Sequence, residues 1–321
     1  FVKSTIENPT FSSQTKTECT SKVSDFGSKF IPSDDFVKKV LKLGIIEEAV
    51  ALAKHKELRE LSKTDGKKKS SVKGIAKLDD ANKAGGPQSS KCTLILTEGD
   101  SAKTFAISGL SEIGRDYYGV FPLRGKLLNV RDATVKQLMN NSEINNIKQI
   151  LGLQQNKKYK SIDELRYGKI LICTDADVDG HHIKGLLINF IGHFWPELLT
   201  QFIDAFRTPI IKATKGATVK EFYHMNDFKD WSETNPVGYN IKYYKGLGTS
   251  TAKEAKSYFK NLNKNTINYK FDNDTLDVLN LAFKKDKADM RKKWIVNGLE
   301  TNEVLDDDTS VTITDFINKE L

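Results

Sequence analysis

Cysteine is scarce in this sequence, and long apolar runs are missing. Its 321 residues include three cysteines, Cys19, Cys92 and Cys173, which lie far apart and match no zinc-binding spacing. We therefore expect free thiols in a reducing, intracellular compartment. No signal peptide and no stretch long enough to cross a membrane is visible, so the sequence predicts no membrane partner.

Two further signals are missing, an initiator methionine and a nucleotide-binding P-loop. The chain opens at Phe1 and stops at Leu321 without the features of natural termini, which suggests a fragment of a longer protein. The order Gly-x-x-x-x-Gly-Lys-Ser/Thr is absent, so we expect no P-loop.

Basic residues are present in moderate excess. The chain has 50 Lys and Arg against 42 Asp and Glu, a net charge of +8 and a pI near 9.1. This excess favours a polyanionic partner, and a basic solvated surface is the alternative interpretation.

The first 91 residues contain one predicted helix between two irregular segments. Residues 1–32 are predicted as loop. The N-cap Ser33 and the acids after it predict a helix to about Leu61, bent at Gly44. Residues 64–91 carry a Lys-Lys-Lys run and Gly-Gly-Pro, a composition typical of a mobile basic linker.

From residue 92 onward, predicted strands alternate with predicted helices. The strands are 92–96, 118–122, 170–173 and 239–245, with a hairpin over 207–224. The helices are 101–110, 132–152 with a break near Asn141, one that stops before Pro196, 251–262 and 274–295. This alternation predicts an α/β fold with a wound parallel sheet.

Acidic side chains follow two of these strands. Glu98 comes directly after the first strand, and Asp175, Asp177 and Asp179 come after the third. In a parallel sheet the carboxyl ends of the strands share one edge, so these residues can share one site. Carboxylates without a Cys or His cluster select Mg²⁺ or Mn²⁺, and such a site suits phosphoryl transfer.

Calcium is the main rival ligand for these acids. Asp175, Asp177, Asp179 and the following glycine match the first half of an EF-hand loop, but the twelfth position, which requires a bidentate Glu, is Leu186. The preceding segment is also β-rich instead of helical. A simple helix cap would account for Asp179 more readily than for Asp175.

Basic loops follow two other strands. One contains Arg124 and Lys126, with Asn129 and Arg131 close behind, and the other contains Lys245 between small residues. Such loops hold phosphates through charge and backbone N–H groups. On the edge that carries the acids, they describe a polyphosphate backbone lying across a metal site. For one of the adjacent histidines, His181 and His182, we expect a DNA-facing or hydrogen-bonding role, and for neither a metal role.

Four motifs together resemble type II DNA topoisomerases. They are Glu98-Gly99-Asp100-Ser101-Ala102, Pro122-Leu123-Arg124-Gly125-Lys126, the run from Asp175 to Gly180, and Tyr244-Lys245-Gly246-Leu247-Gly248-Thr249. The first and third resemble the two acidic motifs of the TOPRIM domain, a Rossmann-like fold with a parallel sheet flanked by helices. Segments 77–82, 114–118 and 183–186 resemble the single-chain eukaryotic and large-DNA-virus branch.

The resemblance implies an ATP-dependent enzyme that cuts both strands of one duplex, passes another through and religates the break. Mg²⁺ would be held by Glu98, Asp175 and Asp177, with Asp179 supporting them or binding a second ion; Mn²⁺ or Ca²⁺ could substitute in binding. Glu98 would also handle the proton at the 3′ oxygen. Double-stranded DNA would be contacted by Arg124, Lys126, Asn129, His182, Lys184 and Lys245.

The resemblance also divides the chain. Residues 1–63 would end the ATPase and transducer region with its connecting helix, and Gln14 and Lys16 would reach the ATP γ-phosphate. Residues 64–91 would be a basic flexible linker, 92–300 the TOPRIM domain with its extension, and 301–321 a linker entering a winged-helix domain. Of the ten tyrosines here, none occupies the context of the nucleophile, so the chain alone is expected to be inactive.

The full-length enzyme would be a homodimer in the nucleus, or in the host cytoplasm or a viral factory if viral.

Two other classes stay open: another TOPRIM enzyme, such as a nuclease or primase, and a non-enzymatic DNA- or Ca²⁺-binding module. The motifs at 122–126 and 245–248, with Gln14-Thr15-Lys16, argue against another TOPRIM enzyme. Leu186 argues against the calcium module. Ala176 and Val178 depart from the polar residues usual between these acids.

Overall fold

The computed structural model describes residues 5–27, 29, 31–234, 236–301, 305 and 309–321. The chain divides into two compact units, Phe1–Lys56 and Glu57–Leu321, which are described separately. In the described part of the chain, no helix combines the length and apolar character needed to cross a bilayer.

The first unit contains loops, then helix α1 (Asp34–Leu41) and most of helix α2 (Ile45–Leu61). The Ser33 hydroxyl accepts a hydrogen bond from the Phe36 N–H at 3.3 Å, which caps α1 as predicted. Gly44 separates the two helices with a φ of +70°, a left-handed conformation that glycine adopts without strain. The predicted helix and its bend are therefore confirmed.

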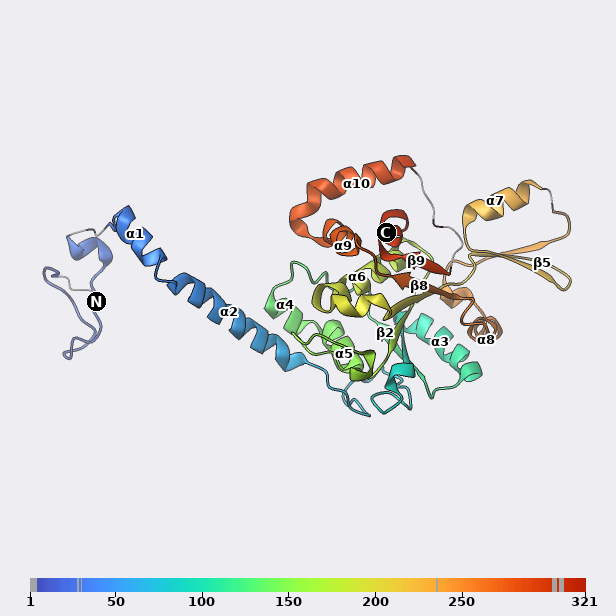
Figure 1. Ribbon diagram of the computed structural model, residues 1–321, viewed down its shortest axis with the longest axis horizontal. Coiled ribbons are helices and arrows are strands. Elements are labelled where there is room, and N and C mark those ends of the chain that lie inside the picture. Colours follow the sequence, from blue (N-terminus) through green and yellow to red (C-terminus); the bar gives the residue numbers. More distant parts are fainter. Residues whose placement is uncertain (1–4, 28, 30, 235, 302–304, 306–308) are drawn as a thin grey trace. The chain divides into compact units, whose positions relative to one another are not determined.

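A six-stranded sheet organises the second unit (Figure 1). Its strands run in the order β2-β1-β3-β4-β8-β9, with bounds β1 (Thr93–Glu98), β2 (Tyr118–Leu123), β3 (Lys169–Cys173), β4 (Ile203–Phe206), β8 (Thr266–Lys270) and β9 (Ser310–Thr312). The first four strands are mutually parallel, β8 is antiparallel to β4, and β9 is parallel to β8. The predicted α/β fold with a largely parallel sheet is confirmed.

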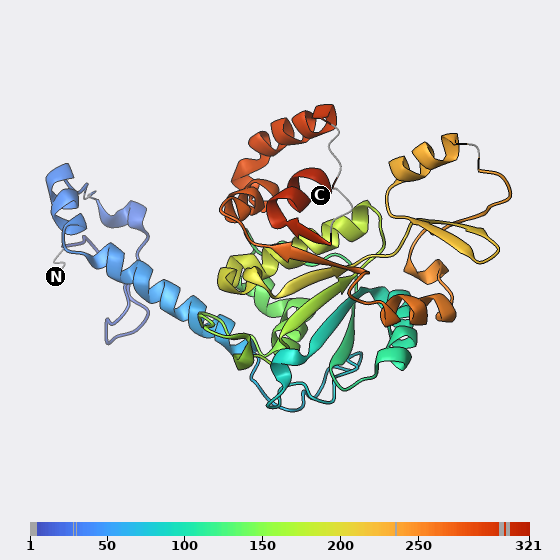
Figure 2. The same ribbon diagram turned by 45° about the vertical axis from the view of Figure 1, so that its right-hand side comes forward.

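Helices cover both faces of this sheet (Figures 1 and 2). One core contains α4 (Val135–Asn140), α5 (Ser142–Leu151), α6 (Val178–Phe194), α9 (Thr275–Phe283) and α11 (Ile313–Lys319). The other lies under α3 (Gly99–Ile113) and α8 (Ala252–Lys260). Strand β1 shows the alternation directly: Leu94 and Leu96 enter the first core and Ile95 the second, all fully buried.

A second, three-stranded sheet projects from the domain (Figures 1 and 2). It contains β5 (Ile211–Lys215), β6 (Thr218–Phe222) and β7 (Asn240–Tyr243), with α7 (Met225–Glu233) packed on it. Its small core gathers Phe222, Phe228 and Trp231. The predicted hairpin over 207–224 is confirmed. The predicted strand over 239–245 is present as β7, but it pairs antiparallel with β5 in this small sheet and does not join the parallel sheet.

Three strands, two helices and one helix break were not predicted from the sequence. The missed strands are β4, β8 and β9, and the missed helices are α7 and α11. The predicted helix over 274–295 is in fact α9 followed by α10 (Ala288–Thr301), because the chain makes a short 3₁₀ turn at Lys285–Lys287.

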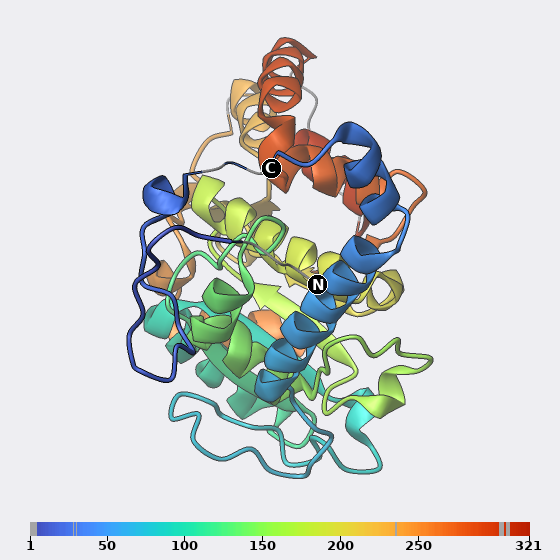
Figure 3. The same cartoon turned by 90° about the vertical axis from the view of Figure 1, so that its left-hand side faces the viewer.

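The prediction of a mobile linker over 64–91 is wrong. The segment runs along one edge of the domain (Figure 3, light blue) and buries Ala81 and Ala84. The Gly85 N–H donates to the Arg166 carbonyl at 2.9 Å, and the Asp80 carboxylate pairs with the fully buried Arg166 guanidinium at 2.5 Å. These contacts hold the segment on the domain, although its amino-acid composition alone is typical of a linker.

The prediction that 301–321 is a linker is also wrong for its second half. Strand β9 joins the main sheet, and Ile313, Phe316 and Ile317 of the following segment are fully buried. Residues 302–304 and 306–308 lie outside the described residues.

Candidate metal and DNA-binding site

The predicted acids lie at the carboxyl edge of neighbouring strands. Glu98 ends β1 and Asp175 follows β3, and the two strands are paired in register at Thr97 and Cys173. Asp177 caps α6, because its carboxylate accepts a hydrogen bond from the Gly180 N–H at 2.8 Å. The shared edge inferred from the sequence is therefore present.

A second loop packs directly on Asp175. The Leu247 N–H donates to the Asp175 carboxylate at 2.7 Å. A Cβ atom placed on Gly246 would lie 2.2 Å from the same carboxylate, and one on Gly180 would lie 2.1 Å from the Asp175 carbonyl oxygen. Both glycines therefore permit close contacts that a larger residue would block.

The electrostatics at Glu98 are those of crowded carboxylates. Burial raises the pKa of Glu98, and the charge of Asp175 raises it further, with smaller contributions from Asp177 and Asp179; a backbone hydrogen bond from Asp175 opposes these effects. One Glu98 oxygen is buried without a hydrogen-bond partner among the described residues. Such a group is stabilised by a proton or by a cation.

The donor set fits a hard divalent cation. It consists of carboxylate oxygens, which Mg²⁺ and Mn²⁺ prefer, and it includes the unpartnered oxygen of Glu98. Across the described ranges, however, no three His, Cys, Asp or Glu side chains are gathered closely enough to hold a metal ion. The carboxylate oxygens therefore suit such a cation, but the side chains of Glu98, Asp175 and Asp177 would have to turn toward a common point to bind it.

The predicted basic loops reach the same edge. Arg124 follows β2, whose Leu123 is in register with Glu98, and its guanidinium lies 3.7 Å from the Glu143 carboxylate. The Lys126 ammonium pairs with Asp179 at 2.7 Å, which lowers the pKa of that carboxyl. Arg124, Lys126, His182 and Lys245 are all exposed.

Two residues predicted as DNA contacts have side chains that are engaged within the protein. Lys184 is only 6% exposed, because α6 turns it toward the core. Asn129 uses both ends of its amide internally: it donates to the Phe283 carbonyl at 2.6 Å and accepts from the Asn189 side chain at 3.1 Å.

The partners of these residues were not predicted from the sequence. Glu143 beside Arg124 carried no signal, because one acid in a helix has no distinctive spacing. The packing of Gly246 on Asp175 was also missed, although a glycine directly after Lys245 was a visible hint. Gln14 and Lys16 are exposed in the first unit, where Lys16 has a φ of +55° and its ammonium lies 5.7 Å from the Phe11 ring centroid.

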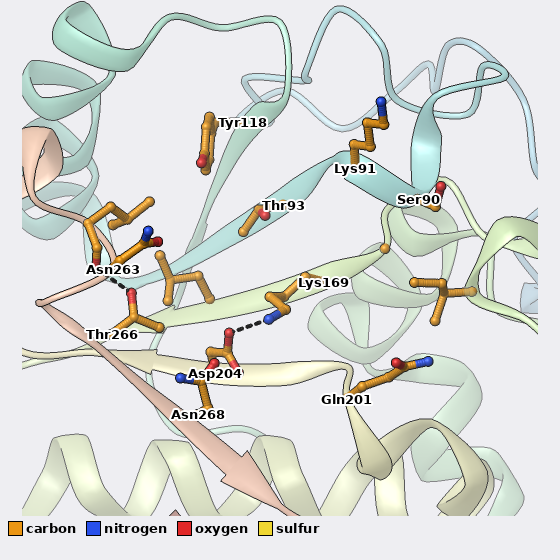
Figure 4. A pocket seen from close by; sticks show the side chains of 14 residues that line it. Ser90, Lys91, Thr93, Tyr118, Lys169, Gln201, Asp204, Asn263, Thr266 and Asn268 are labelled. Carbon is orange, nitrogen blue, oxygen red and sulfur yellow. Dashed lines mark hydrogen bonds and ion pairs between the residues drawn. The ribbon is translucent and has the colours of Figure 1, made fainter. Parts of the chain in front are cut away.

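A separate cavity of about 470 Å³ lies away from the predicted residues (Figure 4). It opens on the sheet face at the amino ends of the strands, where Lys169 of β3 pairs with Asp204 of β4 at 2.6 Å. Thr93 and Tyr118 also line it. None of the predicted metal or DNA residues does.

Comparison with known proteins identifies the domains. Residues 93–211 match the Toprim domain, and residues 206–321 match the C-terminal associated domain of TOPRIM. The whole chain is 52% identical to DNA topoisomerase 2 of Bombyx mori and 50% identical to DNA topoisomerase 2-alpha of Homo sapiens. The chain belongs to the type II DNA topoisomerase family.

The chain spans 22% of the length of these topoisomerase relatives. It also resembles the DNA-binding, cleavage and re-ligation domain of Plasmodium falciparum topoisomerase II, with 48% identity and a TM-score of 0.76 over 78% of this chain and 35% of that one. The match to residue 321 agrees with the burial of β9 and α11 in the domain core.

Proposed function

We propose that this chain is the metal-binding Toprim portion of an ATP-dependent type II DNA topoisomerase. The enzyme would break both strands of one duplex, pass a second duplex through and religate the first. The observation that carries the proposal is the meeting of acidic and basic loops at one sheet edge, where Lys126 pairs with Asp179 and Leu247 bonds Asp175. The similarity to DNA topoisomerase 2 supports it.

Within this proposal the acids hold Mg²⁺, with Mn²⁺ or Ca²⁺ as substitutes in binding. Glu98, Asp175 and Asp177 are the proposed ligands, and Asp179 supports them or takes a second ion. Bound Mg²⁺ would stabilise negative charge on the oxygens of the phosphodiester. Glu98, whose pKa is raised, is suited to hold the proton exchanged with the 3′ oxygen.

The exposed basic residues are the proposed DNA contacts. Arg124, Lys126 and Lys245 would bind backbone phosphates of double-stranded DNA, with His182 beside them. Arg124 and Lys126 follow β2 at the sheet edge that carries the acids, and the loop after Lys245 comes from the small sheet and packs on Asp175. A phosphate held by these cations would therefore lie near the metal ligands.

The remaining functions belong to the proposed full-length homodimer. Gln14 and Lys16 would contact ATP once the rest of the ATPase domain is present, and a winged-helix domain would supply the nucleophilic tyrosine. We propose an intracellular enzyme, in the nucleus or, for a virus, in the host cytoplasm or viral factory.

Substitution of the acids tests the proposal. In the full-length protein, Glu98→Gln or Asp175→Asn should reduce Mg²⁺-dependent cleavage of supercoiled DNA by more than roughly a hundredfold, because each removes a proposed ligand charge. Cleavage complexes trapped with detergent measure this loss, and Asp100→Asn, an exposed acid of the same motif, is the control. Wild-type cleavage by both variants would refute the site, and released ends without attached protein would indicate a nuclease.

A further inference from the structure

The loop over residues 244–250 is held at its middle and at its two flanks. At the middle, Leu247, which is only 2% exposed, donates its N–H to the Asp175 carboxylate at 2.7 Å. Within the loop, the Thr249 N–H and hydroxyl both donate to the Gly246 carbonyl, at 3.1 and 2.6 Å. These turn contacts do not determine where the loop sits relative to the sheet.

Glu254 on α8 holds the two flanks of the loop. Its carboxylate accepts hydrogen bonds from the Tyr244 hydroxyl and from the Lys242 ammonium, the latter at 2.9 and 3.0 Å. The same carboxylate accepts from the Thr251 N–H at 2.7 Å and from its hydroxyl at 2.9 Å, which completes the capping box of α8. One side chain therefore joins the strand before the loop to the helix after it.

Helix α8 is a rigid support for this contact. Ala255 and Phe259 are fully buried in the core shared with α3. A Cβ atom on Gly109 of α3 would lie 2.2 Å from the Phe259 ring, so the two helices are in close contact. Glu254 thus connects the loop that touches Asp175 to a helix that is fixed in the core.

The charge of Glu254 strengthens this junction. Its hydrogen bonds with Tyr244, Thr251 and Lys242 outweigh the effect of burial and lower its pKa to about 2. The carboxylate is therefore ionised near neutral pH. Hydrogen bonds to a charged acceptor are stronger than neutral ones.

We propose that Glu254 is a positioning residue for the metal site, because it fixes loop 244–250 so that the Leu247 N–H orients the Asp175 carboxylate. The proposal rests on the function proposed above for Asp175. Outer contacts of this kind hold a ligand oxygen in the direction needed for a metal, and their loss typically weakens metal binding by roughly 10–100-fold.

The experiment measures the loop and the metal separately in this chain. Glu254→Ala should speed hydrogen exchange of the Leu247 amide by about fivefold or more, as expected for loss of roughly 1 kcal/mol of hydrogen bonding. Its affinity for Mn²⁺, measured by titration calorimetry, should fall roughly tenfold or more. Tyr244→Phe, which removes one hydroxyl, should shift both quantities in the same direction by less.

Glu164→Ala is the matched control. Glu164 also completes a capping box, with Ser161, and pairs with Lys157 at 2.8 Å, but it makes no contact with loop 244–250 among the interactions described. It should change neither quantity.

Unchanged Leu247 exchange in folded Glu254→Ala would overturn the proposal, as would an equal effect of Glu164→Ala. If Glu254→Ala does not fold, Tyr244→Phe decides by the same criterion. If the wild-type chain binds no Mn²⁺, the proposed function fails while the exchange result still decides whether Glu254 holds the loop.

Discussion

Among single residues, Gly246 is important to the candidate site because its backbone lies so close to the Asp175 carboxylate that no side chain fits between them. Gly246 has a φ of 175°, which any residue can adopt. Its requirement for glycine therefore comes from space alone, since a Cβ would lie 2.2 Å from Asp175.

Alanine at this position tests the argument. We expect Gly246→Ala to lower the free energy of unfolding by about 1–3 kcal/mol through overpacking and to displace the Asp175 carboxylate. Urea unfolding and Mn²⁺ titration measure the two effects. Gly248→Ala is the control in the same loop, because its Cβ would lie 3.8 Å from Ser101, an ordinary contact. Equal losses in both variants would contradict a specific contact with Asp175.

Asp204 provides a residue-scale prediction about pH. Its side chain is 6% exposed, and burial raises its pKa by more than Lys169 lowers it. A carboxyl with a raised pKa stabilises the fold below its ordinary value of 3.8 and loses that contribution as pH rises through the folded-state pKa. At neutral pH the ionised Asp204 carboxylate therefore lowers the stability of the fold, because its pair with Lys169 does not fully offset its burial.

Replacement by Asn should remove this pH dependence. As pH rises from below 3.8 toward 7, the stability of Asp204→Asn should increase relative to wild type. Urea unfolding at a series of pH values measures the difference. Lys169 stays partly exposed in the variant, so its own charge remains solvated. A difference that declines with pH would show that the fold stabilises the ionised form, and a constant difference would show that folding leaves the pKa of Asp204 unchanged.

At the scale of elements, the C-terminal strand and helix are part of the domain. Ile317 of α11 is fully buried, so Ile317→Ala should lower the free energy of unfolding by about 2–5 kcal/mol through lost burial and a cavity. Ile295→Ala makes the same change in α10 at a side chain that is 50% exposed, and it should stay within about 0.5 kcal/mol of wild type. A small effect at Ile317 would restore the linker interpretation of this segment.

The elements that sequence predicts well are those with a strong local signal. β1, β2 and β3 are buried runs that end in polar motifs, and the bend at Gly44 follows from one residue. β4 is only four residues long, and β9 three, too short for periodicity to register. Their place depends on neighbouring strands, which a local pattern cannot show.

The residues of the candidate site were likewise predicted only in part. Its acids were predictable because three carboxylates after one strand are unusual. The burial of Lys184 and the internal hydrogen bonds of Asn129 were not, because motif membership does not say which contacts a side chain makes within the fold. The 64–91 segment was likewise misjudged because its anchors, Arg166 and Tyr167, lie far along the chain.

Across the whole molecule the net charge is +8, and the lysines near the candidate site differ in their exposure. Lys126 and Lys245 are exposed there, whereas Lys184 is buried. The pair between Lys126 and Asp179 is also exposed, at 46% and 58% of the two side chains. Such a pair contributes only about 0–1 kcal/mol, so Lys126 can leave it for a phosphate at small cost.

The salt dependence of DNA binding separates these lysines. Each lysine that neutralises a phosphate contributes about one to the slope of log K against log salt concentration. Lys126→Ala and Lys245→Ala should therefore each reduce the slope by about one, and together by about two, in fluorescence anisotropy titrations with duplex DNA. Lys184→Met, which removes a buried charge at similar volume, should leave the slope unchanged if the variant folds by circular dichroism. A reduced slope for Lys184→Met would mean that α6 rotates on DNA binding, and unchanged slopes for the other two would make them ordinary surface charges.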